Sequence, residues 1–256
     1  MIALRTSREI DKIRQSCRVV GLAHRAIRKL IQPGIASEEL DHVAEKIVQD
    51  QGAMPAFKGY HGYPATTCIS INEQVVHGIP GNRKLEEGDI VSVDIGAKFH
   101  GYYGDQAFTF AVGEISLELK SLMKVSQEAL QRGIEAARGG GRLADICGAV
   151  QNWVESNGFS IVRQFVGHGI GRELHEDPAV PNYLPVERNP RLRKGMVLAI
   201  EPMVNLGGPD VVVADDGWTA SASDRMPSAH FEHVIAITDD SCQILTMSEE
   251  EVAAIR

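Results

Sequence analysis

The sequence has no paired cysteines, no long apolar run and no cluster of basic residues. The four cysteines lie far apart without a C-x-x-C pair, which excludes a disulfide framework and a zinc ribbon, so we expect reduced thiols. No apolar stretch is long enough to cross a bilayer, and the first residues lack the apolar core of a signal peptide. The sequence therefore predicts a cytoplasmic protein that does not associate with a membrane.

Several common signatures of function are also missing. The net charge is −8 and no run of Lys or Arg offsets it, so we expect no binding to nucleic acid. The segment that begins at His175 fails the H-E-x-x-H zinc motif because residue 179 is alanine, and no G-x-S-x-G or P-loop pattern is present. These absences leave an ordinary globular composition, with 43% apolar residues available for a core.

Apolar periodicity predicts helices that alternate with strands. We expect helices over residues 7–31, over 37–52 with Ser37 as its cap, over 116–137 and over 142–157. We expect extended segments over residues 66–71, 90–95, 102–111, 196–204, 210–214, 217–223, 229–238 and 242–246, the second and third of these as an antiparallel pair.

One internal similarity decides the expected architecture. Residues 85–94 and 192–201 share a leucine, a glycine, an apolar strand and a final acid at matching positions, an offset of 107 residues. The helices expected before these two segments match at nearly the same offset, which points to a repeated unit. We therefore predict a single α+β domain over residues 1–256, with an inner antiparallel sheet and outer helices.

The repeat divides that domain into two related halves, at about residues 1–112 and 113–256. Its final acids are Asp94 and Glu201, which would sit at equivalent strand positions across a pseudo-twofold axis. Asp105 on the neighbouring strand and Glu232 before another apolar strand add two more acids. Carboxylates on the inner face of apolar strands are costly unless they are paired or bound to a cation.

A Gly-punctuated stretch, residues 165–178, suits neither a long helix nor a regular strand, and it holds His168 and His175. Several carboxylates and one imidazole can bridge two divalent cations, and His168 is the natural nitrogen ligand. Such an oxygen-rich site suits Mn²⁺, Fe²⁺ or Co²⁺ somewhat better than Zn²⁺, which stays open.

Each residue also has an ordinary structural interpretation. Asp94 could be a turn acid, His168 a hydrogen-bonded core histidine, and Glu232 the partner of Arg163 or Arg172. Asp105 could satisfy the backbone of a Gly-rich connection, and Glu201 could end a strand. Taken singly, these interpretations are favoured; taken together, with the repeat supplying two of the acids, the metal site is favoured.

At these residues the sequence closely resembles the type I methionine aminopeptidases of bacteria. The resemblance runs collinearly from about residue 4 to 248 and rests on these stretches: residues 59–64, 72–80, 94–105, 167–171, 175–178, 200–205 and 231–233. It implies the pita-bread fold, in agreement with the two halves predicted above. It also implies removal of the N-terminal initiator methionine from nascent polypeptides with a small second residue, by attack of a metal-activated water on the first peptide bond.

The resemblance further implies the roles of individual residues. Two divalent ions (Co, Mn, Fe or Zn) would be held by Asp94, Asp105, His168, Glu201 and Glu232. Glu201 would be the general base, His175 would donate to the developing oxyanion, and His77 would contact the scissile amide nitrogen. The methionine pocket would consist of Tyr60, Tyr63, Cys68, Leu174 and Trp218. Backbone carbonyls of Asn72, Gln74 and Ser228 would hold a monovalent cation.

The partners implied are nascent peptide N-termini, including those at the ribosome, and we expect a monomer. Two alternatives stay open. An Xaa-Pro aminopeptidase or prolidase would share the fold, although we expect a longer N-terminal domain in those proteins. A non-catalytic binding protein of the same fold is the second, although such a protein would be expected to lose metal ligands, and all five are present.

Overall fold

The computed structural model describes residues 1–185 and 187–246, so residue 186 and the expected domain end at 247–256 lie outside the described part. The described helices lie close to the predicted ranges: α1 (Ser7–Arg28), α2 (Ser37–Asp50), α3 (Leu117–Ala136) and α4 (Leu143–Ser156), with a short 3₁₀ turn, η1 (Tyr60–Gly62). None of these helices is both long and apolar enough to span a bilayer.

Antiparallel strands fill the space between the helices. In the first half they are β1 (Met54–Pro55), β2 (Thr67–Ile71), β3 (Gln74–Val76), β4 (Ile90–Phe99) and β5 (Tyr102–Ala111). In the second half they are β6 (Ser160–Ile161), β7 (Gly167–Gly169), β8 (Glu176–Val180), β9 (Val197–Ile200), β10 (Met203–Asn205), β11 (Val211–Val213), β12 (Ala220–Ala222), β13 (Ser228–His230), β14 (His233–Ile237) and β15 (Cys242–Ile244).

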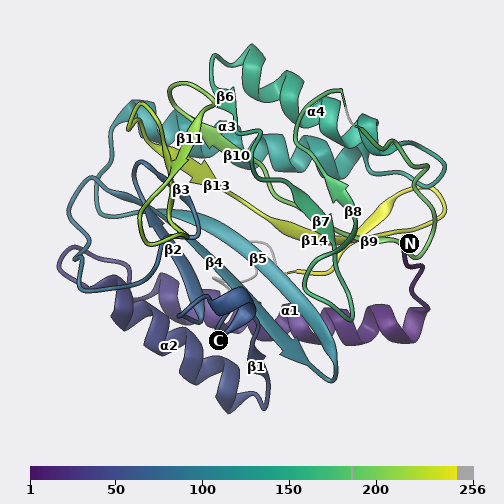
Figure 1. Cartoon of the computed structure of the whole chain (residues 1–256), viewed down its shortest axis with the longest axis horizontal. Coiled ribbons are helices and arrows are strands. Elements are labelled where there is room, and N and C mark those ends of the chain that lie inside the picture. The colour runs from purple at the N-terminus through teal and green to yellow at the C-terminus, as the bar shows by residue number, and fades with distance from the viewer. Residues whose placement is uncertain (186, 247–256) are drawn as a thin grey trace.

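The layers agree with the predicted α+β architecture. Figure 1 shows α1 and α2 along one side of the long β4–β5 hairpin, and α3 and α4 on the opposite side of the molecule. The strands between them form β1-β4-β2 with β5 beside β4, β15-β14-β9-β7-β8, and two smaller three-stranded sheets. One large apolar cluster runs from α1 and α2 through β4 to α3 and α4, so the helices bury their apolar faces against the sheets.

The internal repeat reappears as repeated hydrogen bonds. Leu85 and Leu192 occupy matching places: the amide of Gly34 donates to the carbonyl of Leu85 at 2.7 Å, and the amide of Gly140 donates to that of Leu192 at 2.8 Å. The glycine of each segment is left-handed, with φ of 95° at Gly88 and 89° at Gly195. A repeated glycine is therefore explained by a repeated turn that L-residues rarely adopt. The division at residues 112 and 113 stays a prediction.

Two of the predicted strands are wrong in one respect, because each is broken in the middle. The range 196–204 divides into β9 and β10, which belong to different sheets, and Glu201 and Pro202 lie at the break. The range 229–238 divides into β13 and β14, also in different sheets, with Glu232 at the break. Proline has no amide hydrogen to continue a ladder, which accounts for the first break.

Three smaller expectations are also wrong. Ser37 does not cap α2; Ala36 is the cap residue, and the Ser37 hydroxyl exchanges hydrogen bonds with the backbone of Gly81 at 2.9 and 3.0 Å. Helix α1 ends at Arg28 rather than at residue 31. The Gly-rich stretch is not irregular throughout, since residues 167–169 form β7, paired with β8 through a register shift and with β9.

The repeat-related glycines supply a matched stability test. An added Cβ would be strained at both sites by the positive φ, but only at Gly195 would it meet backbone, 2.7 Å from the carbonyl oxygen of Arg5; at Gly88 the nearest atom is 3.9 Å away. We expect Gly88→Ala to lower the free energy of unfolding by about 1–2 kcal/mol and Gly195→Ala by roughly 1–3 kcal/mol more. Urea titrations of both variants measure this, and equal losses would contradict the predicted close approach.

Candidate active site and metal centre

A cavity of about 310 Å³ is lined by residues that lie on both sides of the predicted division at residue 112. Its walls come from both halves and include all of the residues predicted for catalysis, metal binding and the methionine pocket: Tyr60, Tyr63, Cys68, His77, Asp94, Asp105, His168, Leu174, His175, Glu201, Trp218 and Glu232. Segments more than a hundred residues apart therefore meet at one place, as the repeat predicted.

Local structure explains why the acids point inward. Asp94 on β4 and Asp105 on β5 lie on adjacent strands of one hairpin, where Asp105 faces Gly96 across the ladder. Glu232 reaches the same place because its amide donates to the carbonyl of Ala107 at 2.9 Å, which joins the start of β14 to β5. The strand breaks in the second half thus turn its two acids toward those of the first.

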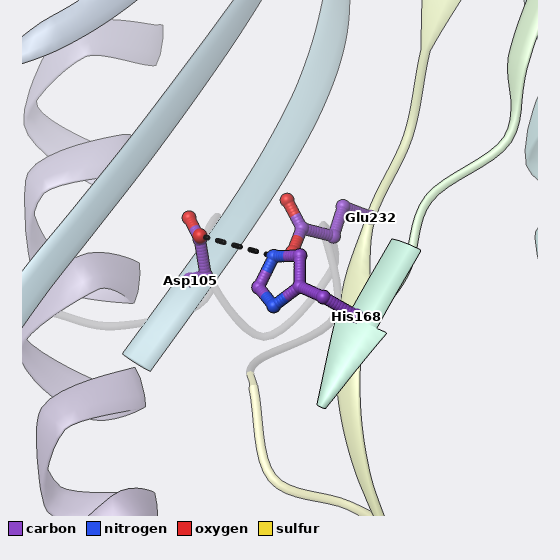
Figure 2. Close-up of side chains that lie close together, drawn as sticks. All are labelled: Asp105, His168 and Glu232. Carbon is purple, nitrogen blue, oxygen red and sulfur yellow. Dashed lines mark ion pairs between the residues drawn. The ribbon is translucent and has the colours of Figure 1, made fainter. Parts of the chain in front are cut away.

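His168 connects these carboxylates. Its Nε2 lies 3.4 Å from Glu201 Oε1 and 4.0 Å from Asp105 Oδ2. Figure 2 shows Asp105, His168 and Glu232 converging from three different strands or strand ends, and one possible ligand atom from each lies within 4.8 Å of the others. His168 sits on β7 opposite Ala199 of β9, which fixes the ring beside Glu201.

The electrostatics of this group are unfavourable for bare carboxylates. Burial raises the pKa of Asp94 to about 7 and holds the pKa of Glu201 well above its ordinary value. Burial, followed by repulsion from Glu232 and Asp94, also holds the pKa of Asp105 far above its ordinary range. The pKa of Glu232 is raised in the same way by burial and by the charge of Glu201. Like charges in a low-dielectric site resist ionisation together.

The donor set fits divalent metal ions. Asp94 Oδ1, Asp105 Oδ1 and Glu232 Oε1 are buried and have no hydrogen-bond partner, and no Lys or Arg of the described residues pairs with the four carboxylates. His168 Nδ1 lies 2.9 Å from the carbonyl of Gly169, which makes Nδ1 the donor and leaves the Nε2 lone pair directed at the acids. Burial lowers the pKa of His168 to about 3, so the ring is neutral, as a metal ligand must be.

The ordinary interpretation of Glu232 as an arginine partner is wrong. Arg172 pairs instead with Glu9 at 3.4 Å, and Arg163 lies 3.8 Å from Glu155. Glu232 is almost fully buried at the cavity floor.

His175 and His77 stand beside the carboxylates without joining them. The ring of His175 packs edge-on against His168, and its Nδ1 lies 2.8 Å from the hydroxyl of Tyr60. His77 adopts a left-handed backbone, φ 60°, and its ring packs edge-on against Phe165 with centroids 5.1 Å apart. Burial lowers the pKa of His77 to about 4 and also lowers that of His175. Both rings are therefore neutral near pH 7.

The predicted pocket residues form one aromatic end of the cavity. Tyr63 and Trp218 pack edge to face, with ring centroids 5.1 Å apart, and Tyr63 and Cys68 are buried. The Tyr63 hydroxyl lies 3.0 Å from the carbonyl of Thr67 and 2.9 Å from that of Gly78, next to His77.

The expected monovalent-cation site is a separate feature. Among its residues, the amide of Ser228 donates a hydrogen bond to the carbonyl of Asn72 at 2.8 Å, and the cation site stays a prediction.

Sequence reasoning missed His230. It is 2% exposed, lines the cavity, and its Nε2 lies 3.8 Å from Glu201 Oε2 without a hydrogen-bond partner. The signal that could have identified it is its position two residues before Glu232, in a segment read as one strand, where alternate side chains share a face. Phe165, which packs on His77, was also missed.

Comparison with known proteins places these features in a family. The model of metallopeptidase family M24 matches residues 11–239. The chain is 50% identical to methionine aminopeptidase 1 of Bacillus subtilis, over 96% of this chain and 99% of that protein. It is similar to the crystal structure of methionine aminopeptidase from Thermotoga maritima, with a TM-score of 0.94, 47% identity and coverage of 97% and 100%. Prolidase from Pyrococcus furiosus is more distant, with a TM-score of 0.78, 25% identity and coverage of 96% of this chain and 66% of that one.

If Glu232 is a metal ligand, its substitution should raise thermal stability in the absence of metal and reduce the stabilisation that metal provides. In metal-stripped protein, Glu232→Gln should raise the thermal midpoint because it removes one crowded carboxylate. Saturating Mn²⁺ should stabilise the unmodified protein by roughly 2.7 kcal/mol at a hundred times the dissociation constant, and stabilise Glu232→Gln much less.

Thermal unfolding with and without Mn²⁺ measures both effects. Asp11 on α1 is exposed, so Asp11→Asn is the matched control. It should change neither the thermal midpoint of the metal-stripped protein nor the stabilisation by Mn²⁺. Equal stabilisation of Glu232→Gln and the unmodified chain by Mn²⁺ would remove Glu232 from the ligand set.

Proposed function

Because the chain belongs to metallopeptidase family M24, we propose that it is a methionine aminopeptidase that removes the initiator methionine from nascent polypeptides with a small second residue. The observation that carries this proposal is a cavity in which an aromatic pocket adjoins four carboxylates, with the neutral imidazole of His168 placed among them. The near-complete, 50% identical match to a methionine aminopeptidase supports the same activity. Nascent chains begin in the cytoplasm, where we expect the enzyme to act; its monomeric state and action at the ribosome stay predictions.

The side chain of the first residue would enter the aromatic end of the cavity. Tyr63 and Trp218 present ring surfaces there, and Cys68 and Leu174 complete a soft apolar wall. A thioether is polarisable and makes favourable contacts with aromatic rings, which suits methionine to this pocket.

The chain's metal-binding residues would be Asp94, Asp105, His168, Glu201 and Glu232, which we assign to two divalent ions of Mn, Fe, Co or Zn. When bound, such ions polarise a carbonyl and lower the pKa of water to near neutrality. Glu201 is the general base: it takes a proton from the attacking water and delivers it to the departing amine. Its carboxylate lies between His168 and His230, which limits its possible orientations.

His175 is suited to donate a hydrogen bond to the developing oxyanion. Burial raises the pKa of Tyr60, so its hydroxyl keeps its proton, while His175 is neutral. We assign the Tyr60 hydroxyl as the donor to Nδ1 in this contact, which places the remaining proton of His175 on Nε2. A donor preorganised in this way can contribute a few kcal/mol in the transition state. His77, also neutral, would contact the scissile amide nitrogen.

The alternatives are less well supported. A prolidase-like activity would share the fold, but the match to Pyrococcus furiosus prolidase, at 25% identity, is about half as identical as the match to the methionine aminopeptidase of Thermotoga maritima, at 47%. A non-catalytic member would not need a complete set of carboxylates with unpartnered oxygens.

Peptide preference tests the proposed function. Metal-stripped protein, reloaded separately with Mn²⁺, Fe²⁺, Co²⁺ or Zn²⁺, should cleave Met-Ala-Ser and leave Ala-Pro-Ala uncut, because the pocket selects the thioether. Release of free methionine by at least one loaded form is the expected result. Preference for Ala-Pro-Ala in all four would replace the proposal with the prolidase alternative.

Single substitutions test the assigned roles. Glu201→Ala should abolish measurable turnover while unfolding stays cooperative, since a general base contributes on the order of 10²–10⁴ in rate. His77→Ala should do the same, because it removes the contact to the scissile amide nitrogen. Tyr60→Phe should lower kcat about tenfold, the value of one hydrogen bond near 1.4 kcal/mol.

The control for Tyr60→Phe is Tyr183→Phe, whose hydroxyl bonds the carbonyl of Arg163 away from the cavity and which should keep full activity. An active Glu201→Ala protein would end the assignment of the base.

A further inference from the structure

A short loop between β7 and β8 carries two residues of the proposed site. The loop spans residues 170–175, and Leu174 and His175 are its last two members. His175 is anchored by its Nδ1 contact to Tyr60, and its Nε2 must face the substrate for the proposed donation. The placement of this loop therefore sets the placement of the donor.

Glu176, the first residue of β8, accepts hydrogen bonds from the backbone of this loop. Its Oε1 accepts hydrogen bonds from the amides of Arg172 at 2.8 Å and Glu173 at 3.1 Å. These two amides belong to the turn that leads into His175. One carboxylate oxygen thus fixes the turn, much as an acid caps the first turn of a helix.

Arg5 fixes that carboxylate. Its guanidinium contacts both oxygens of Glu176, and the two side chains are only 9% and 16% exposed. Both contacts come from Nη2, and a charge-assisted hydrogen bond of this kind is roughly twice as strong as one between neutral groups. The pair joins positions 171 residues apart in the sequence.

Arg5 is itself rigidly placed. Its amide donates to the carbonyl of Gly195 at 2.7 Å, in the turn of the second repeat. Its guanidinium lies against Gly171, where an added Cβ would come within 2.5 Å of it. Gly171 is also fixed through its backbone, because its carbonyl accepts a hydrogen bond from the amide of Tyr103 at 2.8 Å. The arginine therefore connects the repeat turn to the loop.

We propose that Arg5 and Glu176 are positioning residues for His175: the ion pair holds the 170–175 loop so that Nε2 of His175 faces the substrate. This inference rests on the proposed function, because it assigns the pair a role in that reaction. A purely structural pair would affect folding and would affect activity equally whether or not His175 were present. A positioning pair loses its effect on turnover once His175 is gone.

The test is a double-mutant cycle on Met-Ala-Ser cleavage. Arg5→Met removes the charge and keeps most of the side-chain stem, and Glu176→Gln keeps an acceptor for the two amides while weakening the pair. Each is made alone and combined with His175→Phe. Lys194→Met, which breaks the exposed ion pair with Asp239, is the matched control for loss of a cation.

We expect Arg5→Met to lower kcat about tenfold or more and Glu176→Gln to lower it less, with Mn²⁺ affinity unchanged. In the His175→Phe background, measured at high enzyme concentration, the same changes should alter kcat by less than about twofold. Arg5→Lys, which keeps the charge but not the planar guanidinium that reaches both oxygens of Glu176, should fall between the unmodified chain and Arg5→Met.

An undiminished loss in the His175→Phe background would overturn the proposal, as would unchanged kcat in both single variants. If Arg5→Met does not fold, Arg5→Lys and Glu176→Gln complete the same cycle. Failure of the proposed function is distinguishable, because it would appear as an unmodified protein that does not cleave Met-Ala-Ser.

Discussion

The mutual repulsion of four carboxylates, two buried and two half-buried, is the constraint on which the rest of this structure depends. Asp94, Asp105, Glu201 and Glu232 cannot all be ionised in one apolar cavity without a compensating charge. No lysine or arginine of the described chain supplies it, and three of the carboxyl oxygens have no hydrogen-bond partner. The fold therefore holds its acids in an arrangement that a multivalent cation would stabilise, and the neutral imidazole of His168 would complete an oxygen-rich donor set.

The sheets are shaped to achieve this convergence. In the first half an unbroken hairpin presents Asp94 and Asp105 on adjacent strands. In the second half both acids stand where the chain leaves one sheet for another, Glu201 before Pro202 and Glu232 at the start of β14. A residue at such a break is released from strand alternation, so its side chain can turn toward the common centre.

Much of the fold and of the site could be predicted from the sequence. The repeat of residues 85–94 at 192–201 gave the two halves, because a turn that needs a left-handed glycine leaves a visible mark in each copy. Helical periodicity gave all four helices, since each buries one apolar stripe. The breaks within residues 196–204 and 229–238 could not be predicted, because apolar residues continue through both segments. Only tertiary pairing decides which sheet each end of a segment joins.

The site, like the fold, has features that the sequence predicts and features that it does not. The five predicted ligands meet in one cavity, but His230 and the contacts of Arg5 with Glu176 were not foreseen. His230 lies in a segment whose strand register was misread, and Arg5 reaches its partner across 171 residues. No local pattern encodes a contact of that range, because it depends on how the completed halves pack.

The division of the ligands between the halves has a consequence for assembly. Of the proposed ligands, Asp94 and Asp105 belong to one repeat and His168, Glu201 and Glu232 to the other, so neither half alone would supply the whole set. A cation bound by residues of both halves would add its binding free energy to the association of those halves. The full affinity for such an ion would arise only after the long-range contacts between the halves have formed.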